Sequence, residues 1–138
     1  MDYFYEFSPD KTFCGYSIHD ISADKLTALF GEPSDVELAE NPGYGEDVTI
    51  YQFNEHGFAL FFNVKKLLNI AVSNPDFKLF GSPVFKLREN ELIDLFKNNG
   101  FPQNEMDSDW GEKQLVFEEA GVTIFFDNQL VSEIFIDV

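Results

Sequence analysis

Cysteine is almost absent from this chain of 138 residues: Cys14 stands alone, so no internal disulfide can form. Basic residues are scarce as well, with nine Lys and Arg against 25 Asp and Glu, which gives a net charge of −16. No apolar run approaches the roughly 18 residues of a membrane-spanning helix, and the acidic, aromatic N-terminus lacks the features of a secretory signal. These absences predict a cytoplasmic protein that binds neither membranes nor nucleic acid.

Recognisable catalytic motifs are missing too: the sequence has no Gly-rich phosphate loop, no G-x-S-x-G and no H-E-x-x-H. Cys14 and His19 lie close together without a nucleophile motif around them, so a buried structural cysteine is the preferred interpretation. The stretch DSDWG matches the start of a calcium loop, but no Glu stands where the bidentate ligand is required. We therefore expect no enzymatic activity, no metal and no cofactor.

Phenylalanine and acid are what the chain has in abundance. Seventeen Phe residues and a hydrophobic content of 44% suffice for one packed domain over residues 1–138. The acids are unevenly placed: no Lys or Arg occurs from Leu26 to Val64, and Lys113 is the only base after Asn98. Such a surface attracts basic proteins. The alternative is that the acidity only keeps a Phe-rich chain soluble.

A repeat of about 65 residues organises the sequence. Residues 51–72 (YQFNEHGFALFFNVKKLLNIAV) align without a gap with 115–136 (LVFEEAGVTIFFDNQLVSEIFI), and ISADKLTALF (21–30) matches LRENELIDLF (87–96). We place the first unit at residues 13–75 and the second at 79–138. Each unit is expected to contain a helix and then three strands, near 47–54, 57–63 and 67–73 and near 112–119, 121–127 and 130–137. The predicted class is α+β, a duplicated helix-plus-antiparallel-sheet module with the sheets joined and the helices on one face.

Alternation along the strands separates two faces of the expected sheet. One set is apolar in both units and is predicted to form the helix-covered core: Tyr51, Phe53, Phe58, Leu60, Phe62, Ile70 and Val72, then Leu115, Phe117, Val122, Ile124, Phe126, Ile134 and Ile136. The other set is mixed and includes Phe61, Phe125, Phe135 and Glu133. Aromatic side chains on an uncovered sheet face would form a binding patch. The alternative is that DYFYEF near the N-terminus or FKLF (77–80) covers them.

The segments between each helix and its next expected strand are acidic and carry one large aromatic residue. ELAENPGYGED (37–47) holds Tyr44 with Glu40, Glu46 and Asp47, and NEMDSDWGE (104–112) holds Trp110 with Asp107, Asp109 and Glu112. An aromatic anchor ringed by carboxylates would suit a basic cleft on a partner. Ordinary solvated loops are the alternative.

The order of these features resembles the module found twice in the β-lactamase inhibitor protein and once in the small lipoprotein of the barrel-assembly machinery. The resemblance rests on LTALFGEP, YQF, HGFALFF and LLNIAV in the first unit and on LIDLFKNNGFP, LVF, AGVTIFF and VSEIFI in the second. It implies two helix-plus-sheet units whose joined, concave surface grips a partner protein. That inhibitor is secreted and disulfide-bonded, unlike the chain expected here, so a β-lactamase is not the expected target.

These observations favour a non-enzymatic, acidic protein-binding or inhibitor protein. The first hypothesis is an immunity protein that occludes a basic toxin or enzyme. The second is a small-ligand-binding or sensory module with a site between the two repeats. The third is a DNA mimic, which ranks last because the acids cluster in loops and not in a regular stripe.

Overall fold

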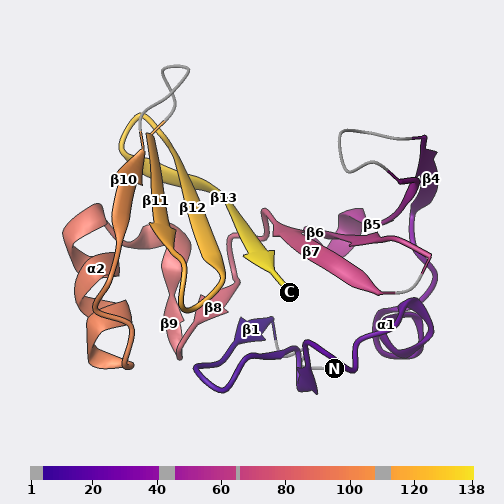
Figure 1. Ribbon diagram of the computed structural model, residues 1–138, viewed down its shortest axis with the longest axis horizontal. Helices are drawn as coiled ribbons and strands as arrows, with labels where there is room; N and C mark the ends of the chain where they lie inside the picture. The colour runs from indigo at the N-terminus through magenta and orange to yellow at the C-terminus, as the bar shows by residue number, and fades with distance from the viewer. Residues whose placement is uncertain (1–4, 41–45, 65, 108–112) are drawn as a thin grey trace.

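Alternating apolar residues build most of this chain into β-structure. The computed structural model describes residues 5–40, 46–64, 66–107 and 113–138, and within them the chain is mixed α+β and mostly sheet. In the described residues an eight-stranded antiparallel sheet, the long sheet, has the order β10-β11-β12-β13-β7-β6-β5-β4 (Figure 1). Its strands are β4 (Asp35–Ala39), β5 (Val48–Phe53), β6 (Phe58–Phe62), β7 (Leu67–Val72), β10 (Glu105–Asp107), β11 (Lys113–Phe117), β12 (Val122–Asp127) and β13 (Leu130–Asp137).

Helix α1 (Ala23–Phe30) lies between a serine and a glycine, the residue types favoured at the start and the end of a helix. Ser22 Oγ accepts a hydrogen bond of 3.1 Å from the Lys25 amide, and Gly31 ends the helix with a φ of 89°. In α2 (Glu89–Asn98) a glutamate of the first turn accepts a hydrogen bond from the amide that precedes the helix. In the described part of the chain, no helix is long and apolar enough to cross a membrane.

The inner face of the long sheet carries the core that the alternation predicts. Phe30 of α1 packs edge-on against Phe58 at 5.1 Å, and Phe96 of α2 stacks on Phe117 at 3.7 Å. The helices therefore contact the same face of the sheet, and the predicted core residues are confirmed there. The buried members are Phe53, Phe58, Leu60, Ile70, Val72, Leu115, Phe117, Val122, Ile124, Phe126, Ile134 and Ile136, with Tyr51 and Phe62 partly buried beside them.

The two halves of the long sheet have the same strand register. Tyr51 lies opposite Leu60 in the first half, and their counterparts in the repeat, Leu115 and Ile124, lie opposite each other in the second. An irregularity in the pairing also occurs at the same place in β6 and in β12. The six strands predicted from the sequence are confirmed, to within one or two residues at their ends.

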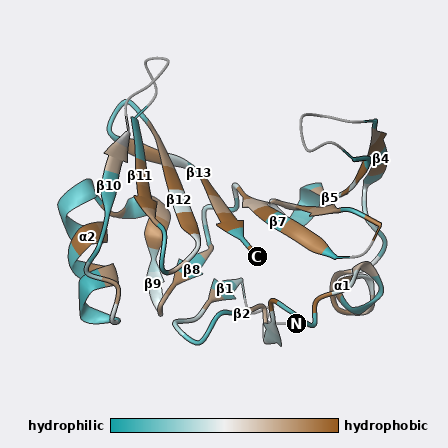
Figure 2. Cartoon of the chain, in the orientation of Figure 1, coloured by the Kyte–Doolittle hydropathy of each residue, from teal (hydrophilic) through white to brown (hydrophobic). Residues whose placement is uncertain are grey.

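Strands β7 and β13 join the two halves into one sheet. Ile70 lies opposite Ile136, and Val72 lies opposite Ile134. In the repeat, Ile134 is the counterpart of Ile70, and Ile136 is the counterpart of Val72. Replacing each residue of one pair by its counterpart therefore gives the other pair, so the joint is locally symmetric. Figures 1 and 2 show the two strands meeting in the middle of the molecule, both strongly hydrophobic.

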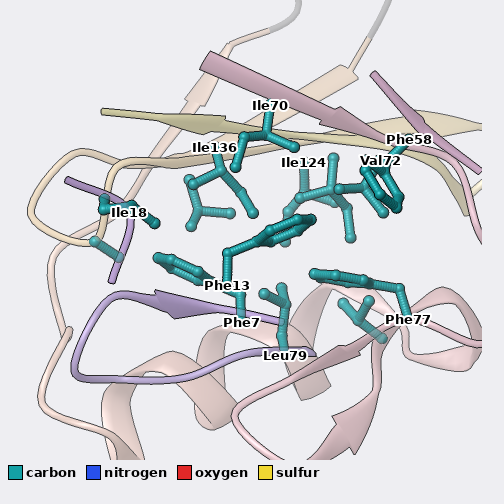
Figure 3. Close-up of a cluster of buried hydrophobic side chains, with 14 of the residues drawn as sticks. Phe7, Phe13, Ile18, Phe58, Ile70, Val72, Phe77, Leu79, Ile124 and Ile136 are labelled. Atoms are coloured by element: carbon teal, nitrogen blue, oxygen red, sulfur yellow. The ribbon is translucent and has the colours of Figure 1, made fainter. Parts of the chain in front are cut away.

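A small sheet of two-residue strands packs beneath the long sheet, on the inner face and between the helices (Figure 1). Its buried Phe13 meets Phe58 edge-on at 5.6 Å, and Phe7, Phe77 and Leu79 point into the same core (Figure 3). Residues 5–7 and 77–80 therefore lie on the inner face, so for them the alternative that they cover the outer face is wrong, and the rest of the N-terminal segment lies outside the described residues. The order is β3-β2-β1-β8-β9, from β1 (Glu6–Phe7), β2 (Thr12–Phe13), β3 (Tyr16–Ser17), β8 (Lys78–Leu79) and β9 (Ser82–Pro83), and the 3₁₀ turns are η1 (Asn54–His56) and η2 (Val84–Lys86).

Glycine is required at the hairpin turns that follow β5 and β11. Gly57 and Gly121 occupy matching positions with φ of 67° and 70°. A Cβ on Gly57 would lie 2.7 Å from the Asn74 Cα, and one on Gly121 would lie 2.8 Å from the Asp137 carbonyl oxygen. Both the left-handed backbone and the close approach therefore exclude a larger residue.

The ends of the long sheet differ from the sequence prediction. Residues 37–47 and 104–112 were expected to be loops, but β4 and β10 pair with β5 and β11 at the two edges. In β4, Val36 and Leu38 alternate with Asp35 and Glu37, which is the period of a strand. The acidic residues masked that period, so the prediction of loops throughout both segments is wrong.

Candidate functional site

The outer face of the long sheet, opposite the helices, is the candidate site. The described helices and the small sheet all pack on the inner face, as Figure 1 shows. Outer-face side chains come from the strand positions that alternate with the core. In strand order these include Glu105, Gln114, Val116, Thr123, Phe125, Asp127, Glu133, Phe135, Asp137, Asn69, Ala71, Ala59, Phe61, Val48, Ile50, Gln52, Asp35, Glu37 and Ala39.

Phe125 and Phe135 form the aromatic centre of this face. Their rings meet edge-on with centroids 5.0 Å apart, and both side chains are only half-buried. Phe135 lies between Thr123 and Ala71 on the neighbouring strands, and these small side chains leave room for its ring. The pairing of β13 with β12 and with β7 therefore sets the aromatic pair beside the joint between the halves.

A hollow of about 320 Å³ lies on this face, across the joint. Phe61 from the first half and the Phe125–Phe135 pair from the second line it, so the structure brings together the three aromatic residues that the sequence predicted. Its lining combines apolar rings with amide, hydroxyl and carboxyl groups. The complete lining is Phe61, Asn69, Gln114, Thr123, Phe125, Phe135 and Asp137.

The polar groups of this hollow were missed among the predicted site residues. Asn69, Gln114, Thr123 and Asp137 come from β7, β11, β12 and β13. Their alternation with core residues was a usable signal, because it places them on the outer face. What brings them together is the pairing of β7 with β13, which the sequence pattern does not specify.

A second hollow, of about 640 Å³, adjoins the first on the side of the turn between β12 and β13. Phe125 and Phe135 line both hollows, so the aromatic pair stands between them. Glu133, which lies opposite Phe125 and is half-buried, contributes a carboxylate to the second hollow. The predicted residue Glu133 is thus placed directly beside the aromatic centre.

The charge of the outer face is negative. Within the described strands, no Lys or Arg occupies an outer-face position, although Lys113 lines the second hollow, and carboxylates lie at both edges and in the middle. Partial desolvation raises the pKa of Asp137. At the β4 edge a hydrogen bond with Asp35, and then the charge of that carboxyl, raise the pKa of Glu37. Close carboxylates of this kind favour a cationic neighbour.

Only some of the acidic residues predicted for the two segments between helix and strand lie within the described residues, and these are found at the ends of the strands of the long sheet. Glu40 directly follows β4 and is exposed, Asp47 is exposed before β5, and Asp107 ends β10. Glu46 Oε1 accepts a hydrogen bond of 2.9 Å from Asn63 Nδ2. Outside the described residues lie Tyr44, Asp109, Trp110 and Glu112. The hypothesis of two aromatic anchors ringed by carboxylates therefore stays a prediction.

Cys14 and the histidines have structural environments. Burial raises the pKa of the Cys14 thiol to about 12, which keeps it protonated at neutral pH, and His19 is exposed. His56 Nδ1 is 2.6 Å from the Tyr5 hydroxyl, and its Nε2 is 3.1 Å from the Phe30 carbonyl oxygen. These bonds tie the N-terminal segment and the end of α1 to the η1 turn. Among the described residues, no three His, Cys, Asp or Glu side chains cluster as a metal site would require.

Comparison with known proteins shows likeness of fold alone. No protein-family model matches the sequence, and neither does any curated protein. An extracellular protein containing an SCP domain from Bacillus anthracis is similar with a TM-score of 0.51 and 18% identity, over 86% of this chain and 43% of that one. A cysteine-rich secretory protein from Staphylococcus aureus is similar with a TM-score of 0.51 and 13% identity, over 99% and 51%. This chain thus spans about half the length of either protein.

A candidate β-lactamase inhibitor protein from Streptococcus mutans is also similar in fold. The TM-score is 0.38 and the identity 14%, over 92% of this chain and 86% of that one. That protein is named for the class that the sequence resembles, but a superposition this loose carries no argument about function.

Proposed function

We propose that this chain is an acidic, non-enzymatic binding protein that holds a basic protein on the outer face of its long sheet. The observation that carries the proposal is the partly buried Phe125–Phe135 pair, which stands between two hollows of the outer face. The described outer-face strand positions carry carboxylates and no Lys or Arg, and Lys113 is the one Lys or Arg that lines either hollow. In its most specific form, the chain is a cytoplasmic immunity protein that occludes a basic toxin or enzyme.

The aromatic pair and the carboxylates would contribute differently to binding. Aromatic residues near the centre of an interface supply much of the binding free energy once water is excluded around them. Carboxylates around them steer a basic partner and accelerate its association, and salt weakens this effect. Asp137 and Glu133 lie close enough to the aromatic pair to meet a Lys or Arg side chain that covers it.

The same proposal accounts for the repeat. We interpret residues 13–75 and 79–138 as two copies of one helix-plus-sheet module. The shared register of the halves and the symmetric pairing of β7 with β13 support this interpretation. Joining two modules edge to edge doubles the width of the sheet, which provides a face large enough for a protein partner.

The test uses the product of the neighbouring gene, because immunity genes usually lie beside their toxin gene. If that product is basic, isothermal titration calorimetry should detect a complex whose affinity falls as salt rises. Phe125→Ala and Phe135→Ala should each weaken binding by about 30-fold, which corresponds to roughly 2 kcal/mol. The exposed Val64 lies outside this face, so Val64→Ala should bind as the wild type does. Equal binding by all three variants, or binding insensitive to salt, would contradict the proposal.

A small molecule in the hollow across the joint is the second candidate function. The hollow combines three aromatic rings with convergent polar groups, which is the composition of ligand sites. In that case a metabolite should raise the melting temperature of the chain, and Thr123→Val should reduce the shift. A basic protein would then bind no more tightly than unrelated proteins of the same charge.

A further inference from the structure

Strand β4 is an edge with no strand beside it on one side. It ends the long sheet, and among the described strands it pairs with β5 alone. Half of the backbone N–H and C=O groups of an edge strand point away from its neighbour and can pair with another chain. Five residues of regular strand are long enough to hold an added strand.

The side chains of β4 leave this edge unprotected. Val36 is 52% exposed and Leu38 is 63% exposed, and both lie on the inner-face side of the strand, opposite Tyr51 and Thr49. Of the features that protect a sheet edge, the sequence DVELA lacks Lys, Pro and a bulge and has only the negative charges of Asp35 and Glu37, which a basic strand would not avoid. The opposite edge, β10, has only three residues. The β4 edge is therefore the better of the two described edges for strand addition.

The other side of β4 selects the charge of an added strand. Asp35 and Glu37 lie on the outer-face side, two residues apart on the strand, so two carboxylates stand next to each other at this edge. Lys or Arg side chains on an adjacent strand would lie directly beside these carboxylates and relieve their repulsion. A second copy of this chain would bring two further carboxylates to the same place and a further charge of −16.

We propose that β4 adds a strand from a basic partner, in which apolar residues alternate with Lys or Arg. The apolar residues pack against Val36 and Leu38, and the basic residues pair with Asp35 and Glu37. The inference rests on the proposed function for the basic character of the partner. Beyond the proposed function, it names β4 as the part of this chain that the partner binds and an alternation of apolar and basic residues as the sequence pattern of the partner's strand.

The probe is a fluorescein-labelled peptide, acetyl-Lys-Val-Lys-Leu-Lys-Val-Lys-amide, titrated into the full chain and followed by fluorescence anisotropy. We expect saturable binding, at least tenfold tighter than that of the same peptide with Leu replaced by Pro or with every Lys replaced by Glu. Proline removes a backbone donor and bends the strand, whereas its effect on net charge is nil. Equal binding of the proline peptide would show attraction by charge alone and would overturn the inference.

Variants of the chain locate the contact. Leu38→Lys places a charge on an exposed side chain of the edge and should weaken binding at least tenfold without loss of folding. Glu37→Gln should weaken binding less and make it less sensitive to salt. Met106, on the β10 edge, is also exposed, so Met106→Lys is the matched control and should bind normally. Loss of binding in Met106→Lys but not in Leu38→Lys would refute the assignment to β4.

Hydrogen exchange distinguishes strand addition from other modes of contact. The peptide should slow exchange of those amides of residues 35–39 that point away from β5, since an added strand accepts their hydrogen bonds. Protection confined to β12 and β13 would place the peptide on the outer face, which would overturn this inference and leave the proposed function standing. Analytical ultracentrifugation should show that the chain is a monomer. If the chain instead self-associates and Leu38→Lys abolishes this, the strand added at β4 comes from a second copy of the chain and not from a basic partner. Protection at 35–39 together with no effect of Phe125→Ala on partner binding would support the edge and refute the proposed face.

Discussion

Truncation of two adjacent phenylalanines tests the assignment of the sheet faces before any partner is known. Phe126 points to the helix side and is 7% exposed, whereas Phe125 lies on the outer face and is half-buried against Phe135. The two residues have the same chemistry and are neighbours in one strand. Their alanine variants therefore differ only in the face from which a ring is removed.

The expected losses of unfolding free energy follow from burial. Replacing a buried Phe with Ala typically costs about 3–5 kcal/mol, and Phe126→Ala should lie near the lower value because the residue borders a pairing irregularity at the end of the core. Phe125→Ala loses one edge-on ring contact, which is about 1 kcal/mol, and the burial of a ring that is only partly covered, so the total loss should be about 2 kcal/mol. For a chain of this length, a change of 1 kcal/mol shifts the melting temperature by roughly 3 °C. Phe126→Ala should therefore melt about 10 °C below the wild type, and Phe125→Ala about 6 °C below it.

Thermal melts followed by far-UV circular dichroism, with urea titrations as a second measure, suffice for this test. The m-value of both variants should match that of the wild type, since the same surface is exposed on unfolding. Large, equal losses in both variants would mean that the outer face is as well packed as the core. The proposal that Phe125 is available to a partner would then be refuted.

Three further predictions concern other parts of the fold. Gly121→Ala should lower the free energy of unfolding by more than about 1 kcal/mol, and by more than Gly81→Ala does. Both glycines have positive φ, but only a Cβ on Gly121 would contact the backbone. Urea denaturation compares the two variants. The pKa of the Cys14 thiol is 9.0 in the unfolded chain and about 12 in the folded one. The contribution of this thiol to the free energy of unfolding should therefore be full below pH 9 and lost as pH rises toward 12. Cys14→Ala should remove that part of the decline, which melts at several pH values measure. Tyr5→Phe removes the hydroxyl at 2.6 Å from His56 Nδ1 and should cost about 1 kcal/mol in the same titrations.

Local patterns in the sequence were sufficient to predict the helices, six strands of the long sheet and its core face. Ser22 and Gly31 bounded α1 because capping depends on residues within one turn. The strand period exposed the core because each inner position must be apolar to pack against a helix. These features depend on neighbours in the chain, so one sequence is enough to find them.

Features that depend on distant residues were less predictable. The aromatic members of the hollow were found from alternation, but its polar members required the pairing of β7 with β13, between segments far apart in the chain. Strand β4 was missed because Asp35 and Glu37 gave its segment the composition of a loop, although an edge strand buries little. The small sheet was missed because two-residue strands have no measurable period.

Comparison of the two halves shows where the chain is specialised. Inner-face counterparts such as Leu60 and Ile124 are apolar in both halves, since each must pack beneath a helix. Outer-face counterparts differ: Ala71 corresponds to Phe135 and lies opposite it at the joint. A small residue in one half therefore makes room for the large ring contributed by the other, and neither half alone could form the hollow beside it. The need for packing explains the similarity of the inner face, and the asymmetry of the outer face is what gives the joined sheet a distinct site.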